Sequence, residues 1–163
     1  MVLEEIEIRE ARKEDFEDIV RLWKKLTDYH HKLNSKRYLS GKEREEKIRQ
    51  SLEKFFAKKR RNRKFLVAVK KGKPIAIMLG SIRKSPSYLY EKRFGEIDVA
   101  FVEEKFRRKG IGRNLFEELL KWFKKRKIKL IEVLVDSKNE IGISAYKNYG
   151  FSEVSKRMAL EES

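Results

Sequence analysis

The sequence predicts a single α/β domain over residues 1–163, built on a mixed β-sheet with flanking helices. Segments with alternating apolar residues are interspersed with segments whose apolar residues recur every three or four positions. Their order is β-α-α-β-β-β-α-β-α-β. The length suits one domain, and no repeat, linker or low-complexity stretch divides the chain.

The first half of the chain predicts a strand, two helices and a hairpin. Ile6 and Ile8 alternate with charged residues, as in a half-buried strand, and residues 13–33 then follow a helical pattern. A second helix is predicted from Lys42 to Lys58. Two strands follow at residues 65–69 and 75–82, and the glycine and proline between them favour a tight turn.

The second half predicts strand, helix, strand, helix and strand. Residues 96–102 read as a strand in which Ile97, Val99 and Phe101 face one way. A helix is predicted from Ile111 to about residue 126, a strand over 128–135, a short helix over 139–150 with Asn139 as its cap, and a last strand over 151–160.

Composition narrows the classes of function. The formal charge of +16 favours anionic partners, and the absence of cysteine excludes disulfide scaffolds and thiol nucleophiles. The N-terminus lacks the pattern of a signal peptide, and no apolar run could cross a bilayer, so we expect a cytoplasmic protein that does not contact a membrane. The abundance of Lys and Glu with a single Gln is typical of a thermophile.

The stretch FRRKGIGR, residues 106–113, places a basic, glycine-containing loop at the start of a predicted helix. The first amides of a helix have no partners within it and attract phosphate groups. Gly110 and Gly112 would let a pyrophosphate approach the backbone; a plain surface turn is the alternative. Leu115 replaces the third glycine of a dinucleotide fingerprint, and the Gly-Lys-Ser/Thr of a P-loop is missing.

Three segments resemble the GNAT superfamily of N-acetyltransferases. FVEEKFRRKGIGRNLFEELL is similar to its acetyl-CoA signature, NEIGISAYKNYGF to its second signature, and IEIREARKEDFEDIVRL to its opening strand and helix. The resemblance implies a mostly antiparallel central sheet and transfer of acetyl from acetyl-CoA directly to a primary amine. The acceptor stays open between protein N-termini, lysines and small amines.

The resemblance also implies which residues hold acetyl-CoA. The pyrophosphate would bind the loop amides, and the pantetheine arm would pair with the end of the central strand. The implied cofactor contacts are Ala100, Phe101, Val102, Arg107, Arg108, Lys109, Gly110, Ile111, Gly112, Arg113, Asn139 and Tyr146.

Two catalytic roles follow from the resemblance. Tyr146 occupies the position of the family's general acid, and an unperturbed tyrosine pKa of roughly 10 lies near that of a thiol. Glu96 resembles the placement of a base glutamate in one branch, and Asp98 is the alternative. Leu134 stands where another branch has its base, which argues against that branch.

The sequence gives less information about the binding site of the acceptor amine. Tyr29, His30, Tyr38, Tyr88 and Tyr90 are candidate substrate contacts. The pair of histidines at 30 and 31 lacks a third ligand at suitable spacing, so no metal site is predicted.

The rival hypothesis is a basic module with the same fold but no transferase activity, which binds nucleic acid or associates with the ribosome. The segment from Lys54 to Lys73 holds ten Lys or Arg and no acid, with phenylalanines interspersed. It could bind nucleic acid or an acidic protein, or it could be solvated charge. The sequence leaves open whether the protein is a monomer or a homodimer.

Overall fold

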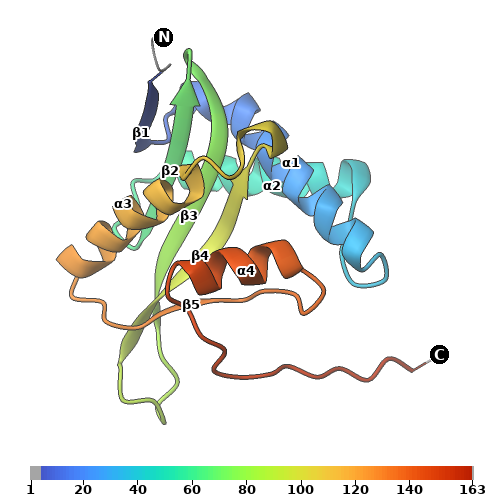
Figure 1. Cartoon of the computed structure of the whole chain (residues 1–163), viewed down its shortest axis with the longest axis vertical. Coiled ribbons are helices and arrows are strands. Elements are labelled where there is room, and N and C mark those ends of the chain that lie inside the picture. Colours follow the sequence, from blue (N-terminus) through green and yellow to red (C-terminus); the bar gives the residue numbers. More distant parts are fainter. Residues whose placement is uncertain (1–4, 163) are drawn as a thin grey trace.

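A five-stranded sheet runs through the computed structural model, which describes residues 5–162 (Figure 1). The strands are β1 (Ile6–Glu10), β2 (Arg63–Lys70), β3 (Lys73–Lys84), β4 (Arg93–Val102) and β5 (Ile131–Val133). The helices are α1 (Phe16–Leu33), α2 (Gly41–Ala57), α3 (Ile111–Lys125) and α4 (Glu140–Asn148), with short 3-10 turns η1 (Lys13–Asp15) and η2 (Glu104–Phe106). The four predicted helices are confirmed.

The strands lie side by side in the order β1-β2-β3-β4-β5. The pairs from β1 to β4 are antiparallel, and only β4 and β5 are parallel. The predicted mixed, mostly antiparallel sheet is therefore confirmed. The parallel ladder is short: it joins Gly95 to Ile131 and ends where Ile97 meets Val133.

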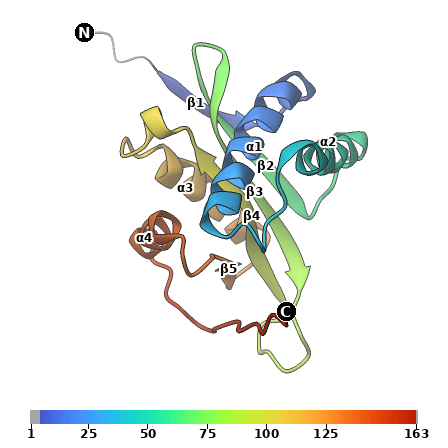
Figure 2. The same ribbon diagram turned by 90° about the vertical axis from the view of Figure 1, so that its right-hand side faces the viewer.

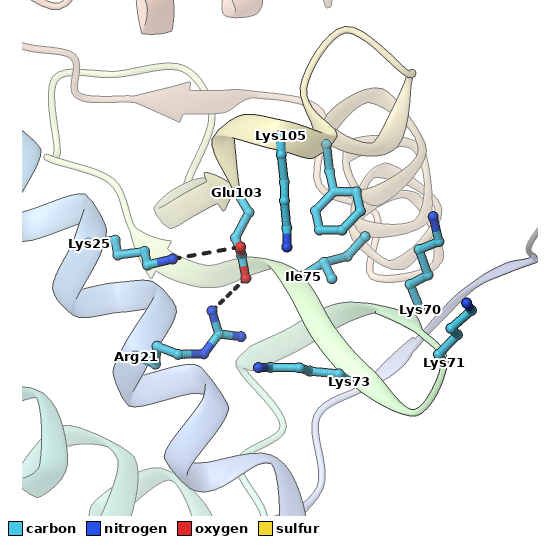
Figure 3. A pocket seen from close by; sticks show the side chains of 9 residues that line it. Arg21, Lys25, Lys70, Lys71, Lys73, Ile75, Glu103 and Lys105 are labelled. Atoms are coloured by element: carbon cyan, nitrogen blue, oxygen red, sulfur yellow. Dashed lines mark hydrogen bonds and ion pairs between the residues drawn. The ribbon is translucent and has the colours of Figure 1, made fainter.

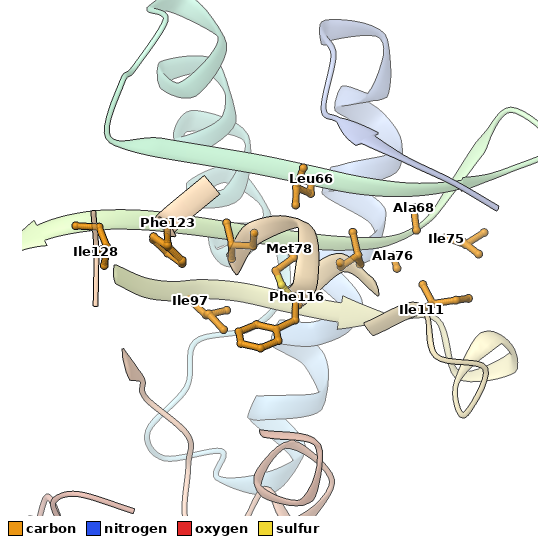
Figure 4. Packing of buried hydrophobic residues seen from close by; sticks show 12 residues of the cluster. Leu66, Ala68, Ile75, Ala76, Met78, Ile97, Ile111, Phe116, Phe123 and Ile128 are labelled. Atoms are coloured by element: carbon orange, nitrogen blue, oxygen red, sulfur yellow. The ribbon is translucent and has the colours of Figure 1, made fainter. Parts of the chain in front are cut away.

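Helix α3 covers one face of the sheet, and α1 and α2 cover the other (Figure 2). Each face carries its own hydrophobic cluster. On one face, Leu115, Leu119 and Phe123 of α3 are fully buried against β2, β3 and β4. Figure 4 shows Phe123 of this cluster beside the strands that carry Met78 and Ile97. On the other face, the helical stripes of α1 and α2 bury residues such as Leu22 and Leu52. Burial of each such side chain contributes about 1.5–3 kcal/mol, so the amphipathic patterns in the sequence determine which helix covers which face.

A β-bulge in β4 overturns the predicted alternation along that strand. Leu79 pairs with Val99 while Gly80 pairs with Ile97, which leaves Asp98 as the extra residue. Ile97 therefore packs in the α3 cluster, whereas Val99 and Phe101 pack on the α1 and α2 side. The expectation that all three share one face is wrong, because a bulge shifts the two-residue period by one.

The last predicted strand is also wrong. Residues 151–162 form no strand and run away from the sheet as extended chain (Figure 1). Phe151 packs on Phe116, but Val154, Met158 and Leu160 are exposed. An alternating pattern makes a strand only where a neighbouring strand supplies hydrogen bonds, and this segment pairs with none within residues 5–162.

Among the described helices, none combines the length and apolarity required to span a bilayer.

Candidate active site

A gap opens beside the C-terminal half of β4. The ladder with β5 stops at Ile97, but β4 continues to Val102, and the bulge at Asp98 lies at the point where the two strands part. Beyond that point no strand within residues 5–162 pairs with the β5 side of β4. The backbone of Val99 to Val102 is thus an open sheet edge. The predicted cofactor contacts Ala100, Phe101 and Val102 all lie on it.

The open edge is connected to the loop before α3 by the short turn η2. We call residues 99–113 the β4–α3 junction. Gly110 has φ 77° and Arg108 has φ 60°, both in the left-handed region, so the chain turns sharply into the helix. The amide of Asn114 closes the first helical turn on the carbonyl of Gly110 at 2.9 Å. The amides of residues 108–113 have no main-chain partner within the described chain. The junction therefore joins an open strand edge to a set of unpaired amides.

The basic side chains of this loop do more than supply charge. Arg107 Nε donates to the carbonyl of Val102 at 2.9 Å, with its guanidinium over the Phe101 ring. Arg113 Nη2 donates to the carbonyl of Asn148 at 2.5 Å, which ties the start of α3 to the end of α4. These two arginines hold the junction in shape, whereas the sequence suggested only an attraction for phosphate.

Gly112 has a structural reason that sequence reasoning missed. A Cβ at this position would lie 2.5 Å from the hydroxyl oxygen of Tyr149 and 3.6 Å from Val102. The Tyr149 ring is in turn stacked on Phe116 at 5.2 Å. Glycine at 112 lets α4 approach α3, in addition to any approach of a ligand to the backbone. At Gly110 a Cβ would meet nothing within 4 Å, so glycine is favoured there by the positive φ.

Tyr146 lies on the inner side of α4, among aromatic rings. Its ring contacts Tyr149 and Phe151 edge-on, at centroid distances of 6.0 and 5.6 Å. Burial raises the pKa of the Tyr146 hydroxyl well above its ordinary value, with a smaller contribution from Tyr149. The hydroxyl is therefore protonated at neutral pH, and its pKa differs from the unperturbed value expected from the sequence.

The two candidate base residues lie side by side and share one cation. Arg83 forms ion pairs with Glu96 and with Asp98, the latter at 2.7 Å. The Asp98 side chain is only 13% exposed, and its Oδ2 is buried without a hydrogen-bond partner. Glu132 of β5 pairs with Glu96 across the parallel ladder. Sequence reasoning missed Glu132, because only the register of β5 brings it next to Glu96.

A cavity of about 280 Å³ lies between the C-terminal half of α1, the α1–α2 loop and the start of α2. We call it the His30 pocket; it is lined by Thr27, His30, Arg37, Tyr38, Leu39 and Arg44. The Tyr38 ring packs on His30 at 5.2 Å, and its hydroxyl donates to Asp136 Oδ2 at 2.8 Å. The pocket therefore borders the β5–α4 loop, which precedes the helix that carries Tyr146.

The electrostatics of the His30 pocket depend on one acidic residue that was not predicted. The amide of Lys138 and, next, the Tyr38 hydroxyl hold the pKa of Asp136 below its usual value. Burial lowers the pKa of His30; Asp136 opposes this effect and Arg44 adds to it. Asp136 follows β5 in the sequence, but only its bond to Tyr38 reveals that it borders this pocket.

Asn139 joins this pocket to α4, and its predicted capping role is confirmed. Its Oδ1 accepts from the amide of Gly142 at 2.9 Å and from the Tyr29 hydroxyl at 3.2 Å. A Cβ at position 142 would come within 2.5 Å of Asn139 Nδ2, so glycine leaves room for the cap. Of the predicted substrate contacts, Tyr29, His30 and Tyr38 are thus brought together.

Tyr88 and Tyr90 lie elsewhere. Both are exposed, in the loop between β3 and β4. That loop precedes β4, whereas the junction lies at the other end of the same strand. The structure therefore does not bring these two tyrosines near the other predicted contacts.

A second cavity, of about 630 Å³, is lined mostly by cations (Figure 3). The lining residues are Arg21, Lys25, Lys70, Lys71, Lys73, Ile75, Glu103, Lys105 and Phe106. Glu103 pairs with Arg21 at 2.5 Å and with Lys25 at 3.6 Å. The cavity borders the β4–α3 junction through Glu103, Lys105 and Phe106, although neither residues 108–113 nor Tyr146 are among its lining residues.

The basic segment from Lys54 to Lys73 does not form one patch. It begins at the end of α2, crosses a loop, follows β2 and ends in the β2–β3 hairpin. Phe65 is 2% exposed, and Phe55 packs against it at 5.5 Å. The phenylalanines are thus core residues, and the ends of the basic segment lie at opposite ends of β2.

No group of three or more acidic, histidine or cysteine side chains within residues 5–162 is arranged to hold a metal ion.

Comparison with known proteins identifies the family. The model of the acetyltransferase (GNAT) family matches residues 23–151. The chain belongs to this GNAT family. The resemblance inferred from the three sequence segments is therefore confirmed.

Individual relatives agree with the family. The GNAT chain is 32% identical over 89 residues to an uncharacterised N-acetyltransferase, MJ1207, of Methanocaldococcus jannaschii; the match covers 55% of the chain and 39% of that relative's length. A variant of the BH1408 protein of Bacillus halodurans has a similar fold, with a TM-score of 0.83 and 22% identity over 96% of this chain and 99% of the other. The aminoglycoside acetyltransferase AAC(6')-Iy, solved with a coenzyme A bisubstrate analogue, gives a TM-score of 0.71 and 15% identity over 98% and 99% of the two chains.

Proposed function

We propose that this GNAT protein transfers an acetyl group from acetyl-CoA to a primary amine. One observation carries the proposal: the open edge of β4 from Val99 to Val102 is followed, after the short turn η2, by the unpaired amides of residues 108–113. An extended ligand arm can pair with an open strand edge, and a phosphate can bind unpaired amides at the start of a helix. Acetyl-CoA has both parts in this order, and when bound it supplies the activated acetyl group.

The residues present fit this ligand in charge as well as in shape. The unpaired amides of residues 108–113 can donate hydrogen bonds to an anion, and Arg108 and Lys109 add positive charge in the same loop. Arg107 and Arg113 are engaged with main-chain carbonyls, so their part is to hold the loop. A main-chain amide near Phe101 or Val102 is available to polarise the acetyl carbonyl.

Two proton transfers accompany the reaction, and two side chains are suited to them. Nitrogen bonds to the acetyl carbon as the carbon–sulfur bond breaks. Asp98 accepts the proton from the ammonium, directly or through a water, because its Oδ2 has no hydrogen-bond partner among the described residues. Tyr146 donates its proton to the departing sulfur.

The raised pKa of Tyr146 is compatible with this role. Burial raises it because the phenolate would be poorly solvated among the surrounding rings. The same surroundings disfavour a bare thiolate. They therefore raise the proton affinity of the departing sulfur as well as that of the Tyr146 oxygen. Arg83 pairs with both Glu96 and Asp98, and Glu132 lies across the parallel ladder from Glu96. Because these three carboxylates outnumber the guanidinium, the local potential favours an approaching ammonium.

The His30 pocket is the place for the acceptor. Its residue Tyr38 binds Asp136, and the neighbouring Tyr29 binds Asn139, the N-cap of the helix that carries Tyr146. AAC(6')-Iy, which has a similar fold, is named for acting on aminoglycosides.

The test measures cofactor binding and turnover separately. Calorimetry with coenzyme A should detect one site per chain, and acetyl-CoA should release free thiol only when an amine is added. A matched pair of variants distinguishes the roles: Asp98→Asn should lower turnover and leave coenzyme A affinity unchanged, while Glu91→Gln, in the loop before β4, should change neither. Absence of coenzyme A binding to the folded protein would reject the proposal.

A further inference from the structure

Resting on the proposed transfer, we infer that the acceptor amine also carries an oxyanion, a carboxylate or phosphate, which binds to Arg44 and Arg37 in the His30 pocket. The inference identifies the class of acceptor mainly from the charge of Arg44, which the fold leaves without a counter-ion.

Arg44 is the main observation. It lies in the first turns of α2, lines the cavity and is half-buried. It forms no ion pair or hydrogen bond with any residue from 5 to 162. The neighbouring Arg49, on the same helix, is paired with both Glu17 and Glu45. A partly desolvated guanidinium without a counter-ion is unfavourable, and an oxyanion in the cavity would relieve that cost.

A second guanidinium lines the same cavity. Arg37 comes from the α1–α2 loop, whose backbone is fixed by the bond from its own amide to the carbonyl of Asn34 at 3.2 Å. Two guanidiniums that approach one cavity from different elements provide the forked donors that carboxylate and phosphate groups accept. A cavity of about 280 Å³ suits a small group of this kind.

The acidic residue beside the pocket completes the pattern. Asp136 accepts from the Tyr38 hydroxyl at 2.8 Å and from the Lys138 amide at 2.9 Å, so its carboxylate is fixed at the border of the pocket, within electrostatic reach of Arg37. An acceptor with an anionic end and an ammonium end would find opposite charges for both. A polyamine or other polycation would instead place a positive group against Arg37 and Arg44.

The first experiment detects oxyanion binding without turnover. The chain has two histidines, so the ring protons of His30 can be followed by NMR. Titration with sodium acetate or sodium phosphate, against sodium chloride at equal ionic strength, should shift the His30 signals to saturation. The variant Arg44→Gln should lose this shift, while Lys47→Gln, which removes an exposed charge from the same helix, should keep it. An unchanged shift in Arg44→Gln, or no saturable shift in the parent protein, would overturn the inference.

The second experiment measures acetylation of matched amines. L-methionine is compared with L-methioninamide, and glucosamine 6-phosphate with glucosamine, so that the two pairs separate carboxylate from phosphate. In at least one pair we expect the anionic member to have a kcat/KM higher by about tenfold to a hundredfold, the range for a hydrogen bond to a charged group. Arg44→Gln should remove this preference by raising KM and should leave coenzyme A affinity intact.

The outcomes separate this inference from the proposed function. If coenzyme A binds and amines are acetylated, but the neutral member is preferred in both pairs, the inference fails and the function stands. If coenzyme A does not bind the folded protein, the proposed function fails, while the NMR titration still decides whether Arg44 binds an oxyanion.

Discussion

The β4–α3 junction and the His30 pocket are built in different ways. The junction consists of residues 99–113, which follow one another along the chain, and its key features are main-chain amides and an open strand edge. The pocket gathers side chains from α1, the α1–α2 loop and α2, and it is closed by a bond to Asp136, 98 residues away from Tyr38. A site made from consecutive backbone keeps its pattern in the sequence, whereas a site assembled from distant side chains does not.

The first prediction removes the acid that both regions would share. Tyr146→Phe should lower turnover by about a hundredfold to ten-thousandfold, because the departing sulfur loses its proton donor. Coenzyme A affinity should stay unchanged, since the ring and its contacts with Tyr149 and Phe151 are kept. Thiol release and calorimetry measure the two quantities.

The control for this variant is Tyr149→Phe, which removes a neighbouring hydroxyl from the same aromatic cluster. Its turnover should fall by less than about tenfold, because this hydroxyl faces Gly112. Equal losses in the two variants would mean that Tyr146 acts through packing and not as the acid.

The second prediction separates the two reasons for glycine at 112. Gly112→Ala places a methyl group 2.5 Å from the Tyr149 hydroxyl oxygen, so we expect a loss of about 1–3 kcal/mol of stability. Coenzyme A affinity should also fall, by about tenfold or more, because the methyl group keeps a phosphate from the adjacent amide.

The double variant Gly112→Ala with Tyr149→Phe decides between these effects. Removal of the hydroxyl relieves the contact, so thermal stability should recover, while coenzyme A affinity should stay low. Recovery of both would show that Gly112 serves only the packing of α4 on α3, and that the junction is less directly involved in phosphate binding than we propose.

The fold was largely predictable because its signals are local. The helical stripes of α1 and α3 and the Gly72 turn between β2 and β3 depend on residues close in sequence. The bulge at Asp98 and the unpaired segment after Phe151 were not predictable, since both depend on whether a neighbouring strand is in register or present at all.

The residues of the candidate site also differ in whether a local sequence pattern predicts them. The positions of Gly110 and of the Asn139 cap follow from a local pattern, and the structure agrees with both. Glu132, Asp136 and the unpaired Arg44 have no local signature, because their significance depends on pairing across the sheet or across a loop. Tyr88 and Tyr90 were chosen for residue type alone, and they lie at the other end of β4.

A third prediction concerns the residue that connects the two regions. Asn139→Ala removes the cap of α4 and the partner of the Tyr29 hydroxyl, so unfolding free energy should fall by about 0.5–2 kcal/mol. Tyr29→Phe removes only the second contact and should have a smaller effect. Denaturant unfolding of both variants measures the difference. Equal losses would place the stabilising effect in the α1 contact and not in the helix cap.

The smallest expected effect is a pH dependence that originates in the His30 pocket. Burial, together with Arg44, lowers the pKa of His30 in the folded protein, while Asp136 opposes the shift. The unfolded chain therefore binds this proton more readily, and the stability that neutral His30 contributes is present above the unfolded pKa of about 6.5 and is lost as pH falls through the folded value. His30→Gln lacks this dependence. The difference in melting temperature between the parent protein and the variant should accordingly shift in favour of the variant between pH 7.5 and about 5.

Saturating acetate or phosphate should weaken this pH dependence, because an oxyanion beside Arg44 raises the pKa of His30. A difference that is constant with pH would mean that the His30 ring is solvated in both states, and that the pocket is more open than its lining residues indicate.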